Sequence, residues 1–220
     1  SGGHPMVYDS NKVFEYGFHW YPALVLYSYS GDTGSLVAGQ TYDYAVCYEW
    51  GDSKGVWHRS APSMYRLVTD PSGSQHSVTF RVPTLTLTDK QDQFDKTYPV
   101  RISLFRTRLQ QDPTDPAIYH VISTFHLLDQ KFNDPSVAYV EFTDDGVSYD
   151  SSDDKLREKR QLYTNGSVVE NIAPPAARHV CYHVNRLWLI SADDPETIWL
   201  SKLHSFNEMP GFYDGWVIRV

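Results

Sequence analysis

The stretch that decides the fold is LVAGQTYDYAVCYEW, residues 36–50. Aromatic and branched side chains recur at every second position along it. Because successive side chains of a β-strand point to opposite faces, we expect four residues to share one face: Tyr42, Tyr44, Val46 and Tyr48. Ala45 and Cys47 then lie on the other face. The stretch predicts a β-strand with these two faces.

The rest of the chain repeats this signal on a smaller scale. The 16 Tyr, 10 Phe and 6 Trp make up 15% of the 220 residues, and Tyr and Phe fit strands better than helices. Turn signals rich in Gly, Pro and Asp separate short strand-like runs: Thr41–Glu49, Val56–Ser60, Ser77–Val82, Val100–Arg106, Ala117–Phe125, Val137–Phe142, His179–Ile190, Thr197–Leu203 and Trp216–Val220. An all-β protein of sandwich or propeller type is predicted.

One segment has a different pattern. Residues 151–160 begin with Ser151 as a candidate cap, continue with two aspartates and end in basic residues, which predicts one short helix. Turn and proline signals around it mark the most probable boundary region, about 145–177. This region and the resemblances given below together imply a division of the chain into an N-terminal β segment and linker (1–35, with a polar start at 1–4 typical of a tag remnant), a sandwich (36–147), a connector with the helix (148–177) and a blade-like β segment (178–220).

Composition excludes several classes of protein. The 19 Lys and Arg against 27 Asp and Glu give a formal charge of −8, which disfavours nucleic-acid binding. A representative apolar run, residues 22–27, falls far short of the roughly 18–20 residues of a membrane helix. The two cysteines, Cys47 and Cys181, cannot form a disulfide framework, and we expect two buried thiols.

Residues 36–63 resemble the last two strands of a fibronectin type III domain. A Leu–Gly–Tyr lead-in opens the first strand, and a Gly-containing turn precedes a second strand that is rich in serine. By this resemblance Tyr42 is the corner tyrosine, whose hydroxyl bonds to nearby backbone. The runs at 77–82, 100–107, 119–122 and 140–144 resemble the earlier strands, so the module is expected in a permuted order.

The order of these elements from about residue 13 is similar to large virion structural proteins of tailed bacteriophages. Residues 185–190 and 193–202 resemble a β-propeller blade. This resemblance implies a non-enzymatic, tail-associated structural protein located in the virion, serving as a rigid spacer with other virion subunits or the host surface as partners. The final run, Trp216–Val220, ends in mid-strand, so we expect the chain to be a piece of a longer one.

No catalytic, cofactor-binding or metal-binding residue is predicted. Nucleophile elbows, phosphate loops and paired-cysteine motifs are absent from the sequence. His179, Cys181 and His183 share one face of a predicted strand and carry zinc-ligating atoms. Same-face residues lie about 6.6 Å apart along a strand, which is too far to wrap one ion, so packed strand residues are favoured.

Two further groups of residues can be interpreted either as a binding site or as ordinary structural residues. An acidic group lacks the spacing of a calcium loop, so a solvated loop is favoured over a calcium site: Asp144, Asp145, Asp150, Asp153 and Asp154. Six aromatic residues are candidates for stacking on sugars: Trp20, Tyr21, Trp57, Trp188, Trp199 and Trp216. The alternative function is thus a carbohydrate-binding accessory module, although we expect Trp188 and Trp199 to be buried.

Overall fold

The computed structural model describes residues 3–72, 76–91, 99–107, 126–146, 162, 171–205 and 207–220. Within these residues the chain forms several antiparallel β-sheets and no helix, which confirms the prediction of an all-β protein. The described segments also lack a helix long and apolar enough to span a membrane. The helix predicted at 151–160 and the strand predicted at Ala117–Phe125 lie outside the described residues.

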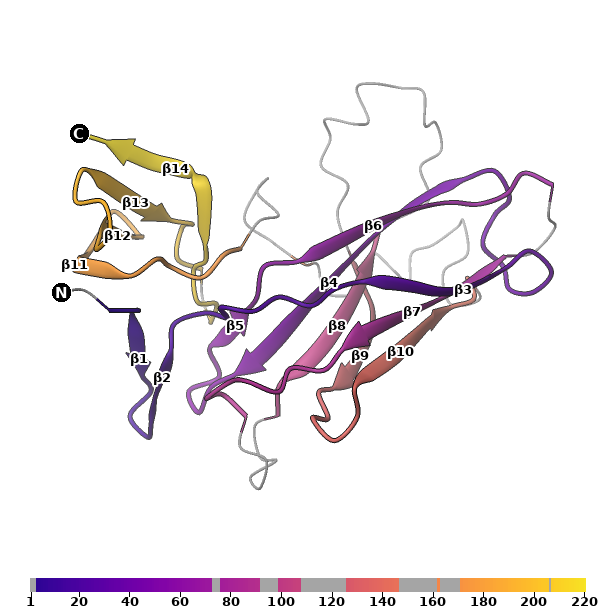
Figure 1. Ribbon diagram of the computed structural model, residues 1–220, viewed down its shortest axis with the longest axis horizontal. Helices are drawn as coiled ribbons and strands as arrows, with labels where there is room; N and C mark the ends of the chain where they lie inside the picture. Colours follow the sequence, from indigo (N-terminus) through magenta and orange to yellow (C-terminus); the bar gives the residue numbers. More distant parts are fainter. Residues whose placement is uncertain are drawn as a thin grey trace.

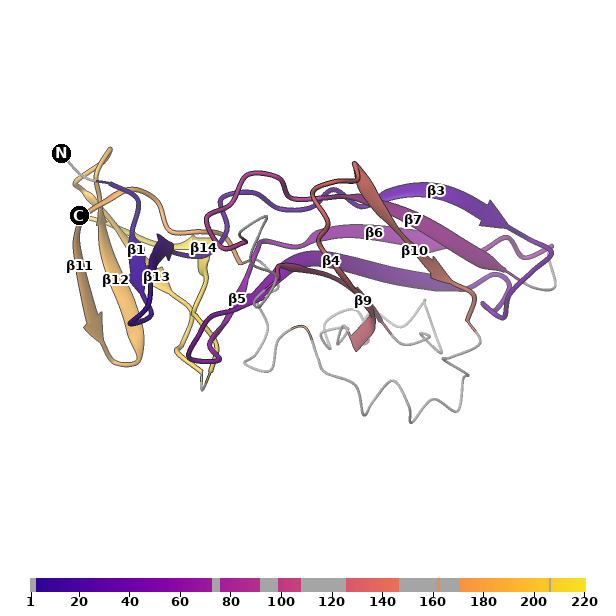
Figure 2. The same ribbon diagram turned by 90° about the horizontal axis from the view of Figure 1, so that it is seen from below.

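The middle of the molecule contains two sheets (Figures 1 and 2). The larger sheet is built around one long strand, β4 (Thr41–Gly51), and its other members are β5 (Trp57–Arg59), β6 (Ser63–Val68), β8 (Arg101–Arg106) and β9 (His126–Phe132). Both β5 and β6 pair with one side of β4, and the order continues through β8 to β9. The smaller sheet has the order β10 (Tyr139–Asp144), β7 (Ser77–Pro83), β3 (Val25–Ser30).

The two sheets share one core. Its cluster joins buried side chains of β4 to those of β7 and β10: Tyr42, Tyr44, Val46, Tyr48, Val78, Phe80, Val82 and Phe142. On the other face of β4, Ala45 and Cys47 pack with Phe105 and Leu162. The predicted division of these side chains between two faces of β4 is therefore confirmed, and both faces are packed.

A second unit lies at one end of the molecule (Figure 1). Four consecutive strands pair as a meander: β11 (Ala177–His183), β12 (Arg186–Ser191), β13 (Thr197–Ser201) and β14 (Phe212–Arg219). The N-terminal hairpin of β1 (Met6–Tyr8) and β2 (Val13–Glu15) packs on this sheet. A backbone bridge from Gly3 to Ala177 and a small core containing Tyr16, Leu189 and Phe212 hold the two together.

A buried joint connects this end unit to the larger sheet. Arg59 on β5 pairs with Glu49 on β4, with 2.6 Å between Nε and Oε1, and also with Glu208 in the loop before β14. Alongside, the N–H of Trp57 donates to the Asn207 carbonyl at 2.9 Å, and the N–H of Met209 donates back to the Trp57 carbonyl at 2.8 Å. Side-chain charge and main-chain bonds thus fix β5 to the loop at 207–209.

The predicted strand His179–Ile190 is wrong as a single element, because the chain turns in its middle. Val184 and Asn185 have φ angles of 50° and 55°, and they separate β11 from β12. Positive φ at two consecutive residues is the requirement of a tight hairpin turn, which Asn-Gly or Asp-Gly normally signals. Val-Asn lacks that signature, so the turn could not be recognised from the sequence and the run was predicted as one strand.

Candidate functional site

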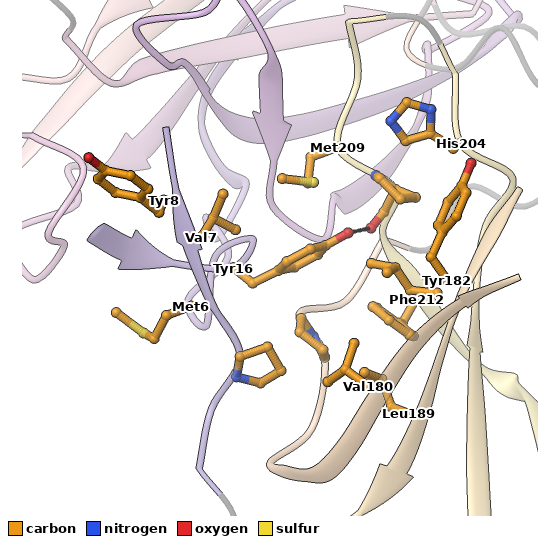
Figure 3. Close-up of a pocket in the computed structure, with 14 residues that line it drawn as sticks. Met6, Val7, Tyr8, Tyr16, Val180, Tyr182, Leu189, His204, Met209 and Phe212 are labelled. Carbon is orange, nitrogen blue, oxygen red and sulfur yellow. Dashed lines mark hydrogen bonds between the residues drawn. The ribbon is translucent and has the colours of Figure 1, made fainter. Parts of the chain in front are cut away.

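A pocket of about 570 Å³ lies between the N-terminal hairpin and the β11–β14 sheet (Figure 3). Three parts of the chain line it, namely residues 5–8 with Tyr16, the strands β11 and β12 with Pro174, and the segment 204–212. The volume falls within the roughly 300–1,000 Å³ typical of small-molecule sites. We therefore take this pocket as the candidate functional site.

The floor of the pocket is apolar and ordered by packing. Leu189 and Phe212 are fully buried there, and the Tyr16 ring meets the Phe212 ring edge-on at 6.2 Å between centroids. Alternation along β11 and β12 directs Val180, Tyr182, Leu187 and Leu189 to the same side of the sheet. The strands thus supply a continuous apolar surface.

The rim is more exposed and mixes apolar with polar groups. Met6 and Tyr8 on β1 are 54% and 64% exposed, and Val180 and Tyr182 on β11 are 54% and 57% exposed. His204 stands beside Tyr182, with 6.3 Å between the ring centroids. Large apolar side chains on both walls of one cavity mark a surface suited to a ligand or partner.

Two of the tyrosines that line the pocket use their hydroxyls as hydrogen-bond donors within the protein. Tyr16 donates to the Pro210 carbonyl at 2.7 Å, and Tyr182 donates to Asn185 Oδ1 at 2.9 Å. Burial raises the pKa of the Tyr16 phenol far above its usual range, so this group stays neutral. Since none of the lining residues is Asp, Glu, Lys or Arg and His204 stands at the rim, the floor of the pocket can bind and orient an uncharged molecule but offers no ion pair.

The predicted strand face of His179, Cys181 and His183 exists on β11, but its residues are not packed. All three are exposed, since β11 is an edge strand of its sheet and no second layer among the described residues covers this face. The expectation of two buried thiols is therefore wrong for Cys181, whereas Cys47 is buried. In the described part of the chain, no three His, Cys, Asp or Glu residues are arranged to hold a metal ion.

The acidic group also differs from the expectation of a solvated loop. Asp144 is buried, pairs with Arg106 at 2.7 Å and accepts a hydrogen bond from the Tyr44 hydroxyl at 2.8 Å. Its charge is therefore part of the interior between the two middle sheets. Asp145 contributes its backbone carbonyl to the N–H of Ser35. Asp150, Asp153 and Asp154 lie outside the described residues.

The aromatic candidates fall into two groups. Trp20 and Tyr21, adjacent in the segment before β3, are 62% and 65% exposed. The others are half-buried and have protein partners: Trp57 and Trp216 lie under Arg101 and Arg186, Trp188 donates to the His183 carbonyl, and Trp199 packs on the core of the end unit. The expected burial of Trp188 and Trp199 is thus only partial.

Sequence reasoning did not identify the pocket. Its residues come from segments nearly 200 positions apart, and no motif links them. One local signal was present, because a strand with His179, Cys181 and His183 on one face must carry Val180 and Tyr182 on the other.

No protein-family model, curated protein or solved structure matches this chain.

Proposed function

We propose that this chain is a non-enzymatic structural component of a tailed-phage particle, associated with the tail. It acts as a rigid spacer and as a contact module for other virion subunits or the host surface. The proposal rests on the sequence resemblance described above. Two features of the strand arrangement and the buried joint at Arg59 support it.

The first support concerns the middle of the chain, which we propose is a permuted fibronectin type III-like sandwich. The strand orders β10-β7-β3 and β6-β4-β8-β9 are those of two antiparallel sheets around one core. The hydroxyl of Tyr42 accepts the N–H of Val37, as expected of a corner tyrosine. In this proposal, β4 and β5 correspond to the last two strands of the module.

The second support concerns the end unit. Its strands β11 to β14 are consecutive in the chain and consecutive in the sheet. A four-stranded antiparallel meander is the unit from which propellers are built. We propose that this unit is blade-like.

The observation that carries the spacer role is the joint at Arg59. A guanidinium that is 7% exposed bridges Glu49 of the larger sheet and Glu208 of the end unit, while main-chain bonds run beside it. Inter-domain contacts without such a fixed interior are expected to permit relative motion. A buried, charge-paired joint suits a protein in which the end unit and the larger sheet keep a fixed orientation, as a rigid spacer requires.

Detection of the chain in purified particles tests the proposal. Antibodies raised against the chain are applied to density-purified phage from a host that carries the gene, and to particles from a strain with the gene deleted. We expect gold label at the tail of the first particles and none on the second. Absence of the chain from purified particles would overturn the proposal.

Binding of carbohydrate is a second candidate function, favoured by the adjacent exposed rings of Trp20 and Tyr21. Aromatic faces bind the apolar C–H faces of sugars, and exposed side chains need no rearrangement to do so. Titration with host envelope polysaccharide should give saturable binding that Trp20→Ala abolishes. Phe132→Ala, which removes an equally exposed ring on β9, serves as the matched control. Absence of binding, or equal loss in both variants, would rule this function out.

A further inference from the structure

We propose that the pocket between the N-terminal hairpin and the β11–β14 sheet binds a small, uncharged, largely apolar molecule whose polar group is a hydrogen-bond donor. An alcohol or N–H group on an alkyl chain or fused ring has this chemistry. The proposal does not depend on the virion assignment, since it rests on the lining of the pocket alone.

The size and shape of the site favour a small molecule. At about 570 Å³ the pocket exceeds the volume of a single side chain and stays within the range of ligand sites. Its walls belong to separate elements, with β1 on one side and β11 on the other, as Figure 3 shows for Met6 and Val180. A ligand between them would contact the N-terminal hairpin and the β11–β14 sheet at the same time.

The charge of the site excludes ions. No Asp, Glu, Lys or Arg is among the lining residues, the basic side chain His204 stands at the rim and not on the floor, and Tyr16 is neutral in its buried position. A carboxylate or phosphate placed on this floor would lose its hydration without gaining a cation. The molecule that fits is therefore neutral.

The hydrogen bonds of two lining tyrosine hydroxyls, the buried Tyr16 and the rim residue Tyr182, select a donor. Tyr16 and Tyr182 each donate their own proton within the protein, to Pro210 and Asn185. A hydroxyl that has donated its proton still carries acceptor lone pairs. Both phenol oxygens thus present only acceptors to the pocket, and a ligand with only acceptor atoms leaves them unsatisfied. Tyr182 is half-exposed at the rim, whereas Tyr16 is buried, so the selection acts chiefly at the Tyr16 oxygen.

The test uses three probes with one alkyl chain and different polar ends: 1-decanol, decyl methyl ether and sodium decanoate. Each competes with the uncharged fluorescent probe N-phenyl-1-naphthylamine for the purified chain. We expect one saturable probe site per chain, with decanol displacing the probe at a concentration at least 10-fold below that of the ether or of decanoate. Equal displacement by all three would overturn the proposed polarity.

Variants locate the site. Val180→Arg places a long cation on the rim and is expected to weaken probe binding at least 10-fold. Val25→Arg, which changes an equally exposed valine on β3, should leave binding unchanged. Tyr16→Phe and Tyr182→Phe should each reduce the preference for decanol over the ether, while Tyr139→Phe on β10 should not. Probe binding that is unsaturable, or that survives Val180→Arg, would show that the pocket is not a ligand site.

Discussion

The backbone N–H of Val37 donates a hydrogen bond to the hydroxyl of Tyr42 at 2.9 Å. Tyr42 stands at the second position of β4 with its ring in the shared core, so this bond ties the incoming chain to the strand that organises both sheets. A ring fixed by packing holds its hydroxyl in place without further loss of side-chain freedom. The bond therefore sets where the chain enters β4.

Removing this hydroxyl tests its contribution. Tyr42→Phe keeps the ring but leaves the half-buried N–H of Val37 without its partner, so the free energy of unfolding should fall by about 1–2 kcal/mol. Urea denaturation monitored by tryptophan fluorescence measures the change. Tyr21→Phe, at an exposed ring, should change it by less than 0.5 kcal/mol, on the order expected for surface substitutions. Equal effects of the two substitutions would contradict the anchoring role.

The strand β4 was predictable because the backbone itself imposes the period of two on its side chains. The edge strand β3 (Val25–Ser30) was not, because nearly all its residues are exposed and the alternation of Tyr and Ser at 27–30 marks no buried face. A β-bulge between Leu26 and Ser28 shifts the pairing with β7 and disturbs any pattern further. Local sequence therefore predicts β4, which is buried on both faces, and misses β3, which is exposed on both.

A buried histidine predicts how stability depends on pH. His58 is fully buried between the rings of Phe14 and Trp50, and burial, aided by the positive charge of Lys90, lowers its pKa to about 4. Asp52, with its Oδ2 3.6 Å from Nε2, acts in the opposite direction but does not compensate. The unfolded chain takes up this proton near pH 6.5 and the folded chain only near pH 4. Stability should therefore fall by about 2–3 kcal/mol as the pH decreases from 6.5 to 4.

Replacing the imidazole isolates this effect. His58→Phe retains an aromatic ring and removes two ring nitrogens that have no hydrogen-bond partner, so the slope between pH 6.5 and 4 should flatten. His183→Phe, on exposed β11, should retain the full slope. Denaturation curves at pH 4, 5, 6 and 7 give the comparison. A slope unchanged in His58→Phe would exclude His58 as its source.

The buried ion pair of Asp144 and Arg106 was not predictable from the sequence. Asp144 belongs to a run of acidic residues that resembles a solvated loop, yet Arg106 lies within ion-pair distance from a strand 38 positions earlier. Likewise, the rings of Tyr16 and Phe212 come from near the two ends of the sequence and pack together in the floor of the pocket. Such pairs depend on the three-dimensional arrangement of the sheets, and no spacing rule along one sequence anticipates them.

The joint at Arg59 should be sensitive to loss of charge. Arg59→Met leaves the fully buried Glu49 carboxylate without its cation, and the free energy of unfolding should fall by about 3–5 kcal/mol. The double variant with Glu49→Gln should recover more than half of this loss, since the fully buried charge is then removed and Glu208, the other partner of Arg59, is partly exposed. Arg66→Met, which breaks an exposed pair with Asp43, should cost less than about 1 kcal/mol. A loss in Arg59→Met no greater than that in Arg66→Met would contradict a buried joint.

The turn between β11 and β12 is a site where a substitution should increase stability. Val184 has a φ of 50°, a left-handed conformation that disfavours β-branched residues by roughly 1–2 kcal/mol, and its side chain is 70% exposed. Val184→Asn introduces a residue that tolerates this conformation and gives up little packing, so stability should rise by about 1 kcal/mol. Val68→Asn, at an equally exposed valine inside β6, should lower stability because Asn is disfavoured in strands. Thermal denaturation of the two variants distinguishes these signs, and a loss in Val184→Asn would contradict the strained turn.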